Sequence, residues 1–245
     1  MEDENPFTQA LDTLAEVTGD PTDETDFTSL LLEDASNGFN ELGRKQMLWA
    51  VRHLWAAGSR FAFNCYRHSA QLILVRGNGQ PAHILLSREG VTQGDPLSMI
   101  LYGVALVPLI RFLKAEHPTL IQAWYADDGA SLGWSDHQIA FITHLQRHGP
   151  HFGIYLNVDK CICIVREADL EKARNKFEQF GFVLTTGARY LGGFVGMDEN
   201  RDEWIDAKVN DWVHGIKELA KAAKKYPQTA YASLTKSLQL EWQYL

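Results

Sequence analysis

Residues 120–134 read LIQAWYADDGASLGW, in which two short apolar runs flank the adjacent carboxylates of Asp127 and Asp128. This pattern predicts a β-hairpin with acidic side chains at its tip. Adjacent carboxylates repel each other unless a cation or water screens them, and Mg²⁺ prefers a few carboxylate oxygens together with water and substrate phosphates. An isolated Asp-Asp pair is more often an ordinary turn, so the rest of the sequence decides between a turn and a metal site.

A second apolar run also ends in a carboxylate. Residues 27–34 read FTSLLLED, which predicts a buried strand in which Leu30, Leu32 and Asp34 share one face. If this strand lies beside the hairpin, Asp34 and Asp127 can hold two metal ions about 3.5–4 Å apart. Such a pair of ions activates an attacking 3′-hydroxyl and stabilises a leaving pyrophosphate. The two patterns together therefore indicate nucleotidyl transfer.

Five blocks of sequence occur in a fixed order along the chain. The first is the strand end at Asp34 followed by Phe39, the second is QGDPLS at 93–98, and the third is YADD at 125–128. The last two blocks are formed by Gly153, Leu156, Asn157 and Lys160, and by Tyr190, Leu191 and Gly192. QGDPLS and YADD, about 30 residues apart, are far more specific as a pair than either motif alone.

Together these blocks resemble the palm domain of reverse transcriptases, the RNA-directed DNA polymerases, and in particular the non-LTR retroelement type. The resemblance covers about residues 28–196 and implies an α+β fold, the ferredoxin-like polymerase palm. The order of predicted strands, tight turns and helices indicates a mainly antiparallel sheet with helices on one face. The expected domains are a disordered acidic lead segment over 1–26, with at most a short helix near 7–17, a palm domain over 27–200, and C-terminal helices over 201–245, where a thumb would begin.

The resemblance implies a catalytic role for three carboxylates. Asp34, Asp127 and Asp128 would hold two Mg²⁺ ions, for which Mn²⁺ can substitute, with Asp128 acting either as a ligand or as a positioning group. Phe39 would be the steric gate that excludes a ribose 2′-hydroxyl; without the resemblance, it would be interpreted as a core residue that opens a helix. Lys160 would stabilise or protonate the leaving pyrophosphate, and an ordinary surface lysine is the alternative.

The resemblance also implies contacts with substrate. Gln93 and Gly94 would line the nucleotide and template path, and Leu191 and Gly192 would belong to a hairpin that grips the primer end. The implied partners are an RNA or DNA template with its primer and deoxynucleoside triphosphates. Asp95 is expected to cap the following helix rather than to take part in catalysis.

Charge is distributed unevenly along this chain of net charge −8. Residues 1–33 hold ten acidic residues and no Lys or Arg, whereas the remaining 212 residues hold 21 acidic and 23 basic residues. Complete reverse transcriptases place a basic fingers region before the first aspartate, so we expect a chain truncated at the fingers and at the thumb. An inert, nucleic-acid-binding remnant is therefore the alternative to an active polymerase. A nucleotidyl cyclase, which can share paired aspartates on a palm, is disfavoured by the QGDPLS block.

Other classes of protein fit the sequence poorly. The acidic N-terminus resembles neither a secretory signal nor a transit peptide, and we find no apolar run of the ~20 residues that span a bilayer. An intracellular protein without a membrane partner is therefore expected, in an undetermined compartment and oligomeric state. A zinc site at His144, His148 and His151 is disfavoured because no H-E-x-x-H pattern accompanies them and Pro150 interrupts the helix.

Several local expectations concern single elements. The runs at 60–66, 69–76 and 81–87 predict strands, the last two as a hairpin around Gly77-Asn78-Gly79. Asp95-Pro96 predicts the start of a helix that ends near Glu116. A hairpin around Gly187 and an amphipathic helix over 203–225 are predicted near the C-terminus.

Overall fold

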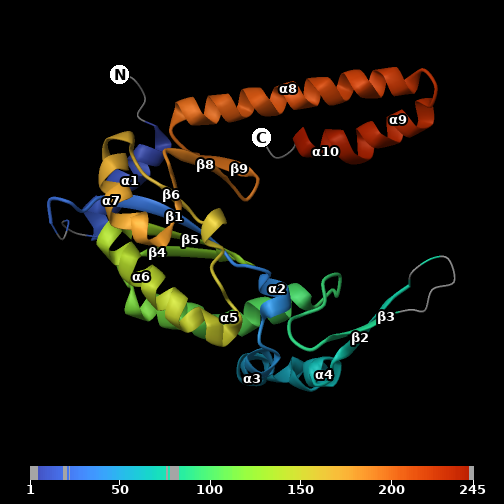
Figure 1. Ribbon diagram of the computed structural model, residues 1–245, viewed down its shortest axis with the longest axis horizontal. Coiled ribbons are helices and arrows are strands. Elements are labelled where there is room, and N and C mark those ends of the chain that lie inside the picture. The colour runs from blue at the N-terminus through green and yellow to red at the C-terminus, as the bar shows by residue number, and fades with distance from the viewer. Residues whose placement is uncertain (1–4, 19–20, 22, 76, 78–82, 243–245) are drawn as a thin grey trace.

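A five-stranded sheet lies at the centre of the computed structural model, which describes residues 5–18, 21, 23–75, 77 and 83–242. The strand order is β4-β5-β1-β6-β7, and every neighbouring pair is antiparallel except β6 and β7. The strands span Ile121–Tyr125 (β4), Asp128–Trp134 (β5), Thr28–Asp34 (β1), Ile162–Ile164 (β6) and Val183–Thr185 (β7). The mixed α/β architecture with a mainly antiparallel sheet agrees with the expectation from sequence (Figure 1).

The sheet is covered on both faces, so the expectation of helices on one face is wrong. The main core contains residues of α5 (Ser98–Glu116), α6 (Ser135–His148) and α7 (Leu170–Phe177), together with Leu31 of β1. A second core lies on the opposite face, where Leu32 packs with residues of α1 (Pro6–Thr18) and of the hairpin formed by β8 and β9. The reason is visible in β1, whose consecutive leucines place apolar side chains on both faces and require cover on both.

Helix α1 corrects the expectation of a disordered lead segment. It spans 13 residues, close to the short helix considered near 7–17, and its Phe7 and Leu11 are buried in the second core. The acidic side chains of α1, Asp12 and Glu16, are exposed, as expected for an amphipathic helix. Burial of two or three apolar side chains therefore outweighs the unfavourable local charge.

A group of short elements follows β1 and forms the lower arm of the molecule in Figure 1. These elements are α2 (Gly38–Glu41), α3 (Arg44–Leu54), α4 (Ala56–Tyr66), β2 (Ala70–Leu74) and β3 (His83–Ser87). The expected strand at 60–66 is wrong because this segment lies in α4, where Gly58, Ala62 and Tyr66 are buried at the four-residue spacing of a helix face. The two strands of the predicted hairpin pair antiparallel as expected, whereas Asn78 and Gly79 of its turn lie outside the described residues.

Helix α5 begins at Ser98, two residues after the predicted first helical position at Pro96. Asp95 precedes the helix and accepts hydrogen bonds from the Leu97 backbone N–H (2.9 Å) and the Tyr66 hydroxyl (2.5 Å), so it orders the preceding turn rather than acting as the cap residue. By length and composition, α5 could also cross a membrane, which corrects the expectation that no stretch of this kind exists. Seven of its residues are buried in the protein core, and a central core helix meets the same two criteria.

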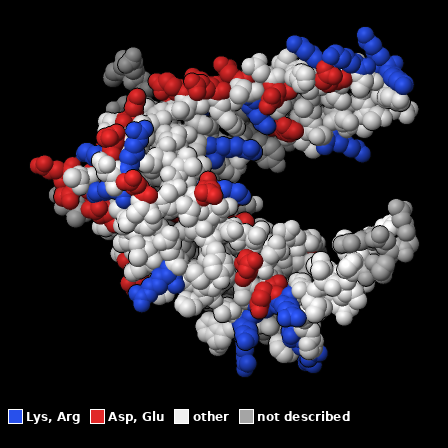
Figure 2. Space-filling view, in the orientation of Figure 1, with Lys and Arg blue, Asp and Glu red and all other residues white. Residues whose placement is uncertain are grey.

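The C-terminal part forms the upper arm. The 26-residue helix α8 (Asp198–Ala223) is followed by α9 (Pro227–Ser233), a π-helical segment (Leu234–Leu238) and α10 (Gln239–Glu241), which run back along α8. The predicted amphipathic helix is thus confirmed, with a start five residues earlier. Figure 2 shows an open cleft between this arm and the lower one, and the β8–β9 hairpin points into it (Figure 1).

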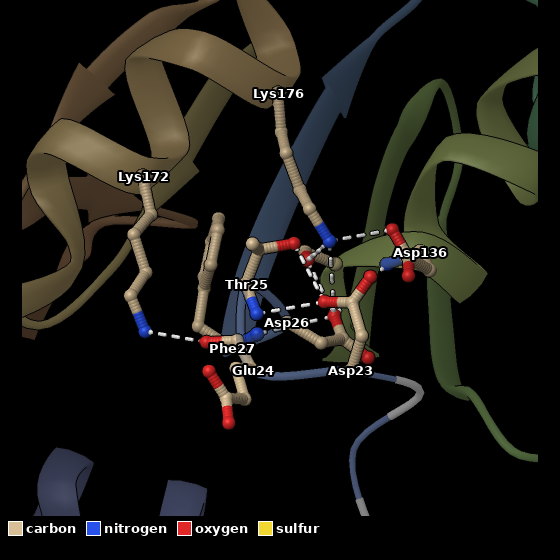
Figure 3. A network of polar contacts seen from close by, with 9 residues as sticks. Asp23, Glu24, Thr25, Asp26, Phe27, Asp136, Lys172 and Lys176 are labelled. Carbon is tan, nitrogen blue, oxygen red and sulfur yellow. Dashed lines mark hydrogen bonds and ion pairs between the residues drawn. The ribbon is translucent and has the colours of Figure 1, made fainter.

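A buried ionic network stabilises the end of the sheet at which β1 begins, opposite the end that carries Asp34 (Figure 3). Asp26, just before β1, accepts hydrogen bonds from the Ser135 hydroxyl (2.5 Å) and the Asp136 backbone N–H (3.2 Å). Lys176 of α7 lies 3.7 Å from the Asp26 carboxylate and 2.6 Å from that of Asp136. The network thereby joins α7 and the start of α6 to the central strand.

Replacing Lys176 with methionine is expected to destabilise the protein by roughly 3 kcal/mol, because removing one partner leaves buried carboxylates uncompensated. The Asp26 side chain is fully inaccessible to solvent, and that of Lys176 is 16% exposed. Urea unfolding followed by tryptophan fluorescence measures the change. Lys172→Met is the matched control, because Lys172 lies one turn earlier and donates only to the Glu24 carbonyl (3.1 Å). Equal stabilities of the two variants would contradict this assignment.

Candidate catalytic site at the ends of β1 and β5

The carboxylates of Asp34 and Asp128 lie on directly opposed residues of neighbouring strands. β1 and β5 pair antiparallel, with Asp34 opposite Asp128. Opposed residues of an antiparallel pair have Cα atoms roughly 4.5–5.5 Å apart and side chains on the same face. The adjacency required for a shared cation site is therefore present.

Asp127 lies in the connection between β4 and β5. Tyr125 pairs with Asp128, so Ala126 and Asp127 form a two-residue hairpin loop. Ala126 has a positive φ of 55°, a conformation that two-residue hairpin turns require and that side chains other than glycine adopt rarely. Strained backbone of this kind often occurs at functional sites. The loop presents Asp127 beyond the end of the sheet, next to Asp128.

The Leu156-Asn157 block anchors the end of β1. The Asn157 N–H donates to the Asp34 carbonyl (2.8 Å), and Leu156 forms an isolated bridge with Ala35. A short 3-10 turn over Val158–Lys160 follows. This turn brings the Lys160 Nζ to 3.9 Å from the Asp34 Oδ2, although the lysine side chain remains 67% exposed. The block thus holds Asp34 in place and positions the Lys160 ammonium beside its carboxylate.

Negative charge accumulates at this end of the sheet. Partial burial, and then the charges of Asp127 and Asp34, raise the pKa of Asp128, while Lys160 opposes the rise. A bound divalent cation would relieve this repulsion, so the donor set is of the kind that Mg²⁺ accepts. Within the described residues, no three His, Cys, Asp or Glu side chains are arranged closely enough to hold a metal ion by themselves. Substrate phosphates and water would therefore have to complete the shell, as they usually do for Mg²⁺.

A shallow cavity of about 200 Å³, the acidic pocket, opens at this point. Its lining combines the strand ends with the β8–β9 hairpin and includes Asp34, Asp128, Lys160, Arg189 and Leu191. Four residues proposed from sequence therefore meet around one cavity, although they lie up to 157 positions apart.

Phe39 follows Gly38, which lies close to Asp127, and does not line the acidic pocket. Its ring stacks on that of Tyr102, with centroids 4.5 Å apart and an interplanar angle of 16°. Gly38 is in contact with the same group: a Cβ at this position would lie 2.5 Å from the Tyr102 hydroxyl and 3.0 Å from the Asp127 Cβ. Glycine at 38 therefore permits the close approach of α2 to the hairpin tip.

Gln93 and Gly94 occupy an exposed turn before α5 and do not line the acidic pocket. Gly94 has a φ of 91° and open space around its Cβ position, so backbone conformation, not crowding, favours glycine there. The same loop is tied to α2, because the Val91 N–H donates to the Phe39 carbonyl (2.8 Å).

Leu191 and Gly192 form the turn of the β8–β9 hairpin, which corrects the hairpin predicted around Gly187. β8 spans Gly187–Tyr190 and pairs with β9 (Gly193–Gly196), whereas β7 joins the central sheet. Leu191 and Gly192 have φ values of 46° and 91°, as in a two-residue hairpin turn with both central residues in the left-handed region. The turn places Leu191, 53% exposed, at the acidic pocket.

Three side chains near the site were not predicted from the sequence. Arg189 and Tyr190 line the acidic pocket, and burial followed by the charge of Asp128 raises the pKa of Tyr190. Tyr102 is fully buried, and burial together with the charges of Asp127 and Asp128 raises the pKa of its hydroxyl. Tyr190 stood within a quoted motif, but no sequence signal marked Arg189 or Tyr102, whose positions depend on the docking of the hairpin and α5.

Comparison with solved structures identifies the architecture. A structure of apo telomerase from Candida tropicalis, truncated from the C-terminal domain, matches 78% of this chain with a TM-score of 0.53 and 13% sequence identity. The fold is reverse-transcriptase-like. A structure of telomerase from Candida albicans in complex with a TWJ fragment of telomeric RNA matches the same share with a TM-score of 0.46 and 11% identity.

This reverse-transcriptase-like chain spans about a third of the length of those telomerase chains, 36% and 33% respectively. No protein-family model matches its sequence, and no curated protein sequence matches it. The structural likeness therefore establishes the fold alone.

Proposed function

We propose that the protein is the catalytic core of an RNA-directed DNA polymerase, which transfers nucleotides from deoxynucleoside triphosphates to a primer 3′ end on an RNA or DNA template. The observation that carries this proposal is the register of β1 and β5, which opposes Asp34 and Asp128 next to Asp127. The reverse-transcriptase-like fold supports it. An origin in a non-LTR retroelement is part of the proposal and rests on the five motif blocks.

Two divalent cations, Mg²⁺ or Mn²⁺, held by Asp34, Asp127 and Asp128 would supply the Lewis acidity that activates the 3′-hydroxyl and stabilises the leaving pyrophosphate. The remaining roles belong to the chain's own residues. The Lys160 ammonium, 3.9 Å from the Asp34 carboxylate, is placed to neutralise charge that develops on the leaving group. Leu191, at the hairpin turn, would support the primer terminus beside these carboxylates.

Primer extension tests this function directly. The full chain is incubated with a poly-rA template, an oligo-dT primer, Mg²⁺ and dTTP, and extended products are separated on a denaturing gel. We expect extension that depends on template, on the divalent cation and on dTTP. Absence of extension with either Mg²⁺ or Mn²⁺, by a chain that still binds the primer–template, would reject the polymerase and favour the inert nucleic-acid-binding alternative.

Replacing Phe39 with alanine is expected to raise the use of rUTP relative to dTTP by at least about tenfold, because removing a packed group from a substrate pocket is worth roughly 1–3 kcal/mol of discrimination. The ring stacks on Tyr102, and the preceding Gly38 lies close to Asp127, a position from which the ring would exclude the 2′-hydroxyl. Single-nucleotide incorporation gives kcat/KM for each substrate. Phe39→Tyr keeps the ring and serves as the matched control. An active Phe39→Ala enzyme with unchanged sugar selectivity would assign Phe39 to the core alone.

A further inference from the structure

A second cavity adjoins the acidic pocket on the far side of the β8–β9 turn. Its volume is about 410 Å³, and it is lined by Arg189, Leu191, Gly192, Trp204, Lys208, Trp212 and Glu241. We call it the basic–aromatic pocket. Arg189 and Leu191 line both cavities, so the two adjoin each other at the hairpin turn. A strand whose end lay at the catalytic carboxylates could therefore continue into the basic–aromatic pocket.

The chemistry of this pocket suits a nucleic-acid strand. Arg189 is exposed, and its side chain makes no hydrogen bond or ion pair within the part of the chain that the structure describes. Lys208 lies over the ring of Trp212, 5.7 Å from its centroid, and Trp204 completes the aromatic lining. Basic side chains interleaved with aromatic rings are the usual surface for a single strand, because the cations contact phosphates and the rings stack on bases. Figure 2 shows basic side chains near the hairpin at the back of the cleft.

A carboxylate from the C-terminal part already engages the pocket's donors. The Glu241 Oε2 of α10 accepts a hydrogen bond from the Trp212 Nε1 (3.1 Å) and lies 3.6 Å from the Lys208 Nζ. Trp242 packs edge-on against Trp212, with ring centroids 6.3 Å apart. One oxygen anion thus contacts both an ammonium and an indole N–H, which is how a backbone phosphate oxygen would be bound.

We propose that α10 is an intramolecular competitor for nucleic acid: the Glu241 carboxylate occupies the place of a backbone phosphate in the basic–aromatic pocket, and an incoming strand must displace it. This inference rests on the proposed function for the identity of the strand. Glu241 is 49% exposed, so its ion pair with Lys208 is weak enough to exchange with a phosphate. Release of α10 would open the pocket without any change in the central sheet.

The test measures binding without catalysis. The Asp127→Asn chain, without divalent cations, is titrated against a fluorescein-labelled oligo-dT of roughly 12 nucleotides, within the usual site size for single strands, and fluorescence anisotropy gives Kd. Glu241→Gln in this background is expected to tighten binding about three- to tenfold, roughly 0.6–1.4 kcal/mol, because a half-exposed carboxylate competes only weakly with an incoming phosphate.

Two matched variants make the result specific. Glu218→Gln removes the same charge from an ion pair on α8 with Lys221 (2.6 Å), outside the pocket, and is expected to leave Kd nearly unchanged. Lys208→Gln should weaken binding, lower the salt dependence by about one phosphate contact, and abolish most of the effect of Glu241→Gln.

The outcomes separate this inference from the proposed function. Unchanged Kd in Glu241→Gln, or equal tightening by Glu241→Gln and Glu218→Gln, would overturn the competitor, even if the parent chain extends primers. A lower Kd in Glu241→Gln but not in Glu218→Gln, and no such decrease when Lys208→Gln is also present, would support α10 as the competitor of nucleic acid. This holds even if no primer is extended. Thermal melting of each variant checks that it is folded.

Discussion

Replacing Asp127 with asparagine is expected to reduce primer extension by about a thousandfold or more while leaving the protein folded. Metal-assisted charge stabilisation contributes several kcal/mol to the transition state, and each 1.36 kcal/mol is a factor of ten in rate. Asp127 lies in the partly exposed β4–β5 loop, and its charge acts on Asp128 together with that of Asp34. Asparagine retains its shape but removes a charge that the cations require.

A control variant and a second readout separate catalysis from folding in this experiment. Asp159→Asn changes an exposed acid next to Lys160 that does not line the acidic pocket, and its extension rate should stay close to that of the parent. Binding of Mn²⁺, followed by the relaxation of water protons, should weaken in Asp127→Asn but not in Asp159→Asn. Full extension by Asp127→Asn would reject the assignment of these carboxylates to the catalytic centre.

Glu33, immediately before the first candidate ligand, is expected to make stability fall with rising pH. Its side chain is buried on the core face of β1, and burial raises its pKa from 4.5 to about 8. The folded state therefore holds a proton between these two values that the unfolded state has lost. Stability contributed in this way is fully present below pH 4.5 and is lost as the pH rises through 8, at about 1.4 kcal/mol per pH unit.

Hydrogen bonding around Glu33 supports the protonated form. The Ser131 hydroxyl lies 2.6 Å from the Glu33 Oε1 and 2.8 Å from the Gln138 Oε1, and its single proton can serve one of them. The Gln138 amide nitrogen donates to the carbonyls of Ser29 (3.2 Å) and Ser131 (2.7 Å), which fixes Oε1 as the acceptor. A protonated Glu33 can donate to Ser131, which then donates to Gln138, so that both short contacts of the Ser131 hydroxyl are satisfied, whereas the Glu33 Oε2 has no partner among the described residues.

Glu33→Gln should therefore remove the pH dependence, because an amide supplies the same donor without a titrating proton. Relative to the parent, the variant is expected to gain a few kcal/mol of unfolding free energy between pH 4.5 and 8. Urea unfolding at a series of pH values measures this difference. Glu178→Gln, an exposed glutamate on a short 3-10 turn, is the matched control. Parallel stability curves for Glu33→Gln and the parent across this range would contradict a buried, protonated Glu33.

Local sequence patterns predict the existence and type of most elements, and they predict the end of the sheet where the carboxylates meet. Local signals were sufficient because three segments each show a clear apolar periodicity and are bounded by turn-forming residues. These segments are the FTSLLLED run, the acidic hairpin at 120–134 and the long apolar helix after Pro96. Glycine at 94 and at 192 likewise follows from the backbone conformation of single turns. The assigned roles of Phe39, Gln93 and Lys160 in nucleotide binding stay predictions.

The contacts between elements that are distant in sequence can be seen in the tertiary structure alone. Residues 60–66 form helix because Ala62 and Tyr66 pack against the core, and a seven-residue window carries too little periodicity to distinguish this from a strand. The hairpin turn lies at Leu191-Gly192 rather than at Gly187, because β7 pairs with β6 in the central sheet and β8 pairs with β9. The position of Arg189 beside Asp34 and Asp128, and that of Glu241 against Trp212, depend on contacts between segments distant in sequence. Such contacts depend on how whole elements dock, and no local pattern of residues encodes them.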